Sequence, residues 1–159
     1  MRITILCVGK IKEKFYRDAL DEYQKRLSKY CKLEIVEVAD EKTPDNASAA
    51  LEEQIKEKEA QRLLAKLRPE TYVCTLEIQG ESLTSERFAD FIEKSGVQGI
   101  SDIAFIIGGS LGLHHSVIER SKKHLSFSAM TFPHQLMRVI LTEQIYRAFR
   151  IIHKEPYHK

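Results

Sequence analysis

Residues 101–116 read SDIAFIIGGSLGLHHS, and this stretch decides the class of fold. Its apolar run from Ile103 to Ile107 has the length of a fully buried strand, and two glycines follow at once, with a third at Gly112. A strand that is apolar on both faces is typical of a parallel sheet covered by helices on each side. The glycine turn either closes tightly into the next helix or lets the backbone approach a ligand, and its spacing alone does not choose between the two.

Outward from this stretch, strand patterns and helix patterns alternate along the chain. Apolar residues at steps of four, such as Phe15, Ala19, Tyr23 and Leu27, predict a helix. The alternation favours an α/β fold, a parallel sheet flanked by helices with right-handed crossovers, in a single domain over 1–159. We expect strands at 1–8, 32–39, 71–78, 102–109 and 124–132, a turn at 79–85, and helices at 12–30, 47–67, from a cap at Ser85, at 115–121, and from Gln135 to about Ile152.

The loops at the carboxyl ends of the strands are the places to look for a ligand, because parallel sheets bind their ligands there. Three of them stand out: the loop after Leu76, the glycine turn at Gly108, and 126–135. Neither GxGxxG nor GxxxxGK[ST] occurs in the sequence. This argues against a dinucleotide dehydrogenase and against a P-loop NTPase.

Composition is that of an ordinary globular protein, with 43% hydrophobic and 30% charged residues and a net charge of +2. No apolar run is long enough to span a bilayer, so we expect a soluble cytoplasmic protein that does not bind membranes. Cys7, Cys31 and Cys74 fit neither a metal knuckle nor a disulfide framework, and we interpret them as reduced core thiols.

Basic residues gather towards the C-terminus beside an aromatic ring, while seven of the acids lie in 34–53. This end of the chain is a candidate phosphate-facing surface. The alternative is a solvated helix end whose cations complement the helix dipole. The residues concerned are Arg138, Arg147, Arg150, Lys154 and Lys159, with His153, Tyr157 and His158 among them.

The C-terminal segment LSFSAMTFPHQLMRVILTEQIYRAFRIIHKEPYHK, at 125–159, carries a specific resemblance when it is taken together with FIIGGSLGL at 105–113 and ITILCVGKIKEKF at 3–15. Over essentially its whole length, the chain resembles the bacterial ribosomal RNA large subunit methyltransferase H family. These are small SPOUT-class enzymes that use S-adenosylmethionine to methylate N3 of a pseudouridine in 23S ribosomal RNA.

The resemblance implies a C-terminal trefoil knot, a homodimer and a substrate that is 23S rRNA in the assembled ribosome. The last predicted helix agrees with a dimer, because it is apolar on more than one face and needs two partners to cover it. The resemblance also implies a pocket for S-adenosylmethionine, with apolar side chains for the adenine and a glycine that permits close approach to the ribose. Its residues would be Leu76, Gly108, Phe127, Ser128, Ala129, Met130, Thr131 and Phe132.

Transfer of a methyl group from a sulfonium needs no metal, but the N3 proton of the base has to be removed. We expect His134 or His158 to act as the base, and Arg138 to hold a carbonyl or phosphate oxygen as a fixed planar donor. Tyr157 is expected to stack on the nucleobase, and Arg147 and His158 to contact the RNA with it.

Each of these assignments has a structural alternative. His134 is also suited to cap the helix that follows it, and Arg138 to pair with an acid such as Glu143. His153, His124 and the pair at 114–115 show no ligand spacing, and adjacent residues point to opposite sides of a regular element, so we expect no metal site there.

Two other functions stay open on the sequence. One is an RNA-binding or ribosome-associated module that keeps the fold without activity. The other is a SPOUT 2'-O-methyltransferase acting on tRNA, although the chain has no additional domain that would grip a tRNA.

Overall fold

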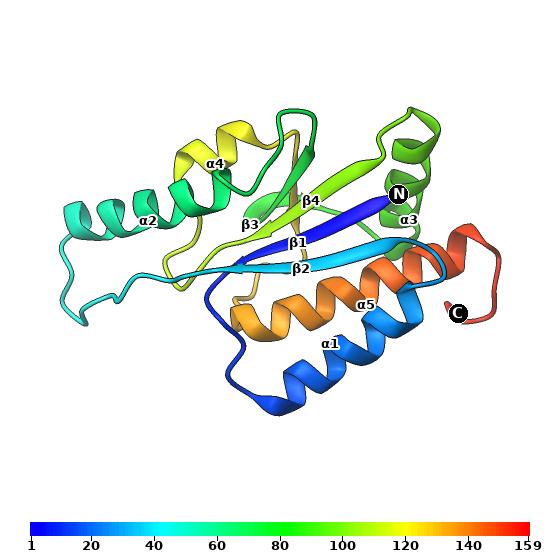
Figure 1. The fold of residues 1–159 in the computed structure, drawn as a ribbon, viewed down its shortest axis with the longest axis horizontal. Coiled ribbons are helices and arrows are strands. Elements are labelled where there is room, and N and C mark those ends of the chain that lie inside the picture. The colour runs from blue at the N-terminus through cyan, green and yellow to red at the C-terminus, as the bar shows by residue number, and fades with distance from the viewer.

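The computed structural model covers residues 1–159 and contains one five-stranded sheet with helices on both faces (Figure 1). Every strand pair is parallel, in the order β2-β1-β4-β3-β5, which confirms the predicted α/β class. The elements are β1 (Arg2–Val8), α1 (Lys14–Leu27), β2 (Lys32–Val38), α2 (Ala49–Leu64), β3 (Tyr72–Ser82), α3 (Ser85–Val97), β4 (Asp102–Ile107), α4 (His115–Arg120), β5 (Lys123–Ser126) and α5 (His134–Ile152).

Each face of the sheet has its own apolar core. Helices α1, α3 and α5 cover one face of the sheet, and α2 and α4 cover the other (Figure 1). Along β1 the side chains alternate, so Ile3, Ile5 and Cys7 belong to the first core, whereas Leu6 and Val8 belong to the second. A strand between two cores has to be apolar at every position, which explains the unbroken apolar run of β4.

All three cysteines are buried and free, as predicted. Cys7 and Cys74 belong to the larger core and are fully buried. Burial raises the pKa of Cys7 to about 12, so its thiolate is strongly disfavoured. These thiols therefore act as core packing groups.

β3 is longer and β5 shorter than the sequence predicts. β3 continues to Ser82, because its pairing with β5 shifts register between Leu76 and Glu81 and then resumes. The predicted turn at 79–85 is therefore wrong in its first half. β5 ends at Ser126, and the remainder of that predicted strand is a loop leading to α5.

Two local predictions about helices are also corrected. The N-cap of α3 is Thr84 rather than Ser85, because the Thr84 hydroxyl accepts a hydrogen bond from the backbone N–H of Arg87. On α1 the predicted apolar stripe is buried only in part. Its first member, Phe15, is 61% exposed, whereas Leu27 at the end of the helix is fully buried.

Helix α5 lies against the sheet between α1 and α3 (Figure 1). These two neighbours cover part of the apolar surface for which the sequence analysis invoked a second subunit. The homodimer and the trefoil knot both stay predictions at this point. No helix of the fold has the length and apolarity needed to cross a membrane.

Candidate functional site

The predicted cofactor residues converge on one pocket of about 380 Å³. It lies at the carboxyl end of β4, beside the part of β3 from Leu76 to Gln79 where the register with β5 shifts, and the loop after β5 completes its wall. Of the eight predicted residues, Ala129 alone does not line it. The lining includes Leu76, Gly108, Phe127, Ser128, Met130, Thr131 and Phe132.

The glycine turn has a structural requirement of its own. A Cβ on Gly108 would lie 2.8 Å from the backbone carbon of Gly112 and 2.9 Å from its oxygen, which no side chain tolerates. Gly112 itself has a φ of 84°, in the left-handed region that favours glycine. The turn is therefore tight, and it also forms part of the pocket wall. The tight-turn interpretation of the glycines is confirmed, and the approach of this turn to a ligand stays a prediction.

Glu77 is a pocket residue that sequence reasoning missed. It lies where β3 leaves its register with β5, and its carboxylate is 2.6 Å from Nδ1 of His124 and accepts a hydrogen bond from the Thr75 hydroxyl. His124, which the sequence left without a role, thus fixes this carboxylate. The signal in the sequence was only an acid directly after a buried run, which is common at strand ends.

His134 lines the pocket as the first residue of α5. The N-cap position belongs to Pro133, and no side chain caps this helix end, so the alternative of a capping His134 is wrong. Partial burial, and next the positive charge of Arg138, lower the pKa of His134 from its ordinary value of 6.5. Its imidazole is therefore neutral at pH 7 and has a lone pair with which to accept a proton.

Arg138 does not line the pocket. Its side chain is completely buried, and one guanidinium nitrogen donates hydrogen bonds of 2.8 Å to the carbonyl oxygens of both Val8 and Gly9 at the end of β1. Its acidic neighbour is Glu37, at 3.6 Å, and not Glu143. The expectation that Arg138 contacts the substrate is corrected, because its guanidinium is completely buried and the nitrogen that donates hydrogen bonds does so to the protein's own backbone.

The three predicted RNA-binding residues form one cluster at the far end of α5, outside the pocket. Glu143 binds Arg147 at 2.7 Å and accepts a 3.0 Å hydrogen bond from the Tyr157 hydroxyl, while the guanidinium lies 4.7 Å from the centre of the Tyr157 ring. His158 is 2.8 Å from Glu86 on α3. The chain end is thus folded back, and His158 does not reach the pocket of its own subunit.

The basic surface predicted at the C-terminus is partly neutralised. Arg138 is buried, and Arg147 pairs with Glu143 as described. Arg150 forms an ion pair with Glu155 and donates to the carbonyl oxygen of Pro156. Fewer free cations are therefore presented here than the sequence suggested.

Comparison with known proteins defines the class to which this fold and pocket belong. A family model described as a predicted SPOUT methyltransferase matches residues 1–158. A solved structure of a probable methylase family protein from Haemophilus influenzae Rd KW20 aligns with a TM-score of 0.53 at 14% identity, over 99% of this chain and 70% of that one. That likeness shows the fold alone.

Curated relatives narrow the class further. The chain is 58% identical to the ribosomal RNA large subunit methyltransferase H 1 of Clostridium perfringens (strain SM101) and 61% identical to the ribosomal RNA large subunit methyltransferase H of Clostridium beijerinckii, over the full length of both chains in each case. The chain therefore belongs to the ribosomal RNA large subunit methyltransferase H family of SPOUT methyltransferases.

Proposed function

We propose that this methyltransferase transfers a methyl group from S-adenosylmethionine to N3 of a pseudouridine in 23S ribosomal RNA, on the assembled ribosome, in the cytoplasm and as a homodimer. The observation that carries the proposal is the pocket itself. Seven of the eight residues that the family resemblance assigns to the cofactor line one cavity, in a chain whose full-length relatives are named as ribosomal RNA methyltransferases.

The pocket suits the methyl donor in shape and chemistry. Leu76, Phe127 and Phe132 offer apolar surface for an adenine ring, and the glycine turn exposes backbone groups beside it. Glu77 adds a carboxylate, held by Thr75 and His124, which favours a ligand with a positive charge. S-adenosylmethionine, when bound, supplies a methyl group on a positively charged sulfur, which is an electrophile without any metal.

His134 is the candidate base within the subunit. A neutral imide nitrogen is a poor nucleophile, so N3 has to lose its proton as the methyl is transferred. His134 lines the pocket, and its lowered pKa keeps it in the proton-accepting form at neutral pH. Arg138 is assigned here as a positioning residue, because it ties α5 to the end of β1 just behind His134.

A partly buried apolar face on α5 supports the proposal of a second subunit. Leu136, Val139 and Ile140 are only partly buried, lie at helical spacing on one face, and stand outside both apolar core clusters. We propose that the tail of the subunit covering this face, including Tyr157 and His158, contributes to the RNA site of its neighbour. In this proposal the RNA is bound by both chains.

The test compares Gly108→Ala with Gly96→Ala. The first change forces a Cβ against the backbone of Gly112 in the pocket wall. The second adds the same atom on α3, where it meets only the side chain of Met1 at 3.4 Å and favours the helix. Each protein is incubated with S-adenosylmethionine and with ribosomes from a strain that lacks this gene, and the 23S RNA is analysed by nucleoside mass spectrometry.

We expect N3-methylpseudouridine with the wild type and with Gly96→Ala. Gly108→Ala should lose at least about tenfold in S-adenosylmethionine affinity, measured by calorimetry, which corresponds to roughly 1.4 kcal/mol. Binding of S-adenosylmethionine without methylation of 23S RNA, but with methylation of tRNA, would assign another RNA substrate. Ribosome binding without S-adenosylmethionine binding would identify an inactive binding module.

A further inference from the structure

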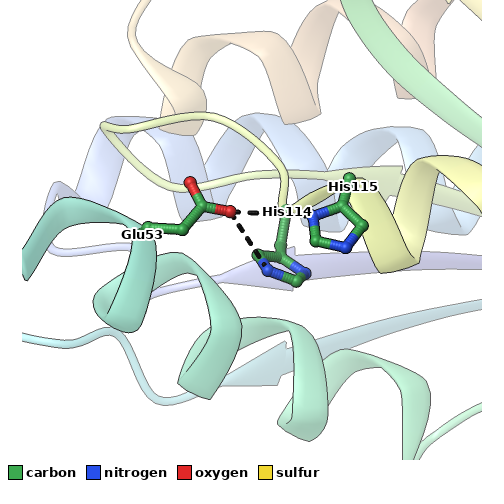
Figure 2. A group of neighbouring side chains, drawn as sticks. All are labelled: Glu53, His114 and His115. Atoms are coloured by element: carbon green, nitrogen blue, oxygen red, sulfur yellow. Dashed lines mark ion pairs between the residues drawn. The ribbon is translucent and has the colours of Figure 1, made fainter. Parts of the chain in front are cut away.

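Two adjacent histidines and a glutamate from a different helix meet on the face of the protein that carries α2 and α4 (Figure 2). Nε2 of His114 lies 3.2 Å from Oε1 of Glu53, and Nδ1 of His115 lies 3.7 Å from the same oxygen. All three donor atoms lie within 4.8 Å of one another. None of these residues lines the cofactor pocket. The expectation that the two histidines point to opposite sides is therefore corrected.

The backbone changes direction between His114 and His115, and this change brings both imidazoles towards Glu53. His114 is the N-cap of α4 and has extended backbone angles, while His115 begins the helix. The chain thus turns between them and does not continue as a regular element, and the two ring centres lie 4.0 Å apart. The periodicity argument fails here because it holds only inside a helix or strand.

The His114 side chain is fixed in this orientation. It is almost completely buried, and its Nδ1 lies 2.8 Å from Oγ of Ser116 and 3.2 Å from the backbone nitrogen of that residue. Its Nε2 is therefore the nitrogen that faces Glu53, as Figure 2 shows. Lys56 lies 2.9 Å from the other carboxylate oxygen, so Oε1 is the oxygen directed at the imidazoles.

These distances match those between the ligands of a tetrahedral metal ion. Zinc binds imidazole nitrogen and carboxylate oxygen at about 2.0–2.2 Å, which puts neighbouring ligand atoms roughly 3.3 Å apart. The two separations from the Glu53 oxygen, 3.2 and 3.7 Å, bracket that value, and the two histidine nitrogens lie within 4.8 Å of each other. Without a metal, Nδ1 of His114 accepts a hydrogen bond from the Ser116 backbone N–H, so Nε2 carries the proton and faces Glu53. Metal binding at Nε2 requires the other tautomer, in which Nδ1–H donates to the Ser116 hydroxyl at 2.8 Å and gives up the bond from the backbone N–H.

We propose that Glu53, His114 and His115 bind a divalent transition-metal ion of the zinc class, with one position left to water. Two imidazoles and one carboxylate suit zinc better than calcium or magnesium, which prefer oxygen ligands. The ion would connect α2 to the start of α4. Because Gly112 and Leu113 of the pocket wall directly precede His114, this connection would also hold the wall in place. The role is structural, and methyl transfer does not require it.

The test is zinc binding to the tag-free, chelator-treated full-length protein without RNA or methyl donor, measured by calorimetry. We expect one zinc ion per chain, and a rise in Tm of roughly 5 °C at about a hundredfold excess over Kd. Cobalt(II) in place of zinc should give the visible absorption of a tetrahedral site. Because RNA and S-adenosylmethionine are absent, the result is independent of the proposed function.

Matched variants locate the ion. Glu53→Gln and His115→Gln should each weaken zinc binding by at least tenfold, and His114→Asn should do the same while keeping an N-cap residue. Glu52→Gln changes the neighbouring, half-buried carboxylate, which is not part of the cluster, and should leave binding unchanged. The proposal is overturned if the wild type binds no stoichiometric zinc, or if His115→Gln binds it as tightly as the wild type.

Discussion

His134 and Arg138 lie one helical turn apart, yet they contact different surroundings. His134 opens onto the pocket, whereas Arg138 is completely buried and binds carbonyl oxygens 130 and 129 residues away in the sequence. The spacing of four residues predicts only that the arginine and the histidine share a helix face. The carbonyl oxygens that accept hydrogen bonds from Arg138 lie at the end of β1. No sequence pattern near α5 therefore predicts them.

The lowered pKa of His134 gives a prediction about pH. The unfolded chain takes up a proton at the ordinary pKa of 6.5, while the folded protein does so only at lower pH. Folding stability contributed by the neutral His134 is therefore fully present above pH 6.5 and is lost as the pH falls below it. Urea unfolding from pH 7.5 to pH 5 should show a weaker pH dependence in His134→Gln than in the wild type.

The same variant tests the role of His134 as the base. If His134 accepts the N3 proton, His134→Gln should lower the rate of methyl transfer by about 10²–10⁴-fold, with little effect on the binding of S-adenosylmethionine. NMR titration of the imidazole gives the pKa directly. A value at or above 6.5 would contradict the environment described here, and an unchanged rate would remove His134 from the mechanism.

At the scale of elements, the sequence predicts most of the fold, because the spacing of apolar residues differs between strands and helices. The long β3 is the exception. Its apolar pattern stops near Ile78, but pairing with β5 resumes at Glu81, where Gly80 lets the two backbones approach closely. A shift in register is set by the partner strand, so the strand's own sequence does not reveal it. Glu77 was missed for the same reason.

Glu143 is one of the groups that hold the tail after α5, through the Tyr157 hydroxyl. Burial and the nearby Glu143 raise the pKa of Tyr157 from 10.0 to about 12. Glu143→Gln should lower this pKa towards 10, because it removes the neighbouring negative charge and releases Arg147. NMR of ring-labelled tyrosine, assigned with Tyr157→Phe, measures the change. Limited proteolysis should remove the tail of this variant faster, and an unshifted pKa would show that burial alone determines it.

On the scale of the whole molecule, the candidate pocket was predictable because a parallel sheet brings the ends of its strands to one edge. Leu76–Gln79 within β3 and the loops that follow β4 and β5 are far apart in the chain, yet all of them line the same cavity. The tail residues were not placed by this rule, since they follow a helix and not a strand. Their contacts with α3 and α5 depend on how the helices pack, which strand order does not determine.

The half-buried apolar face of α5 leads to a prediction about assembly. Val139→Lys places a charge on the half-buried face formed with Leu136 and Ile140, and a charge at the centre of an apolar interface is strongly unfavourable. Val97→Lys makes the same change at a valine that is 84% exposed at the end of α3, and serves as the control. Light scattering during size-exclusion chromatography should give a dimer for the wild type and for Val97→Lys, and a folded monomer for Val139→Lys. If the tail of one subunit completes the RNA site of the other, the monomer should keep S-adenosylmethionine binding and lose methyl transfer. A wild-type monomer with full activity would contradict both the dimer and the shared site.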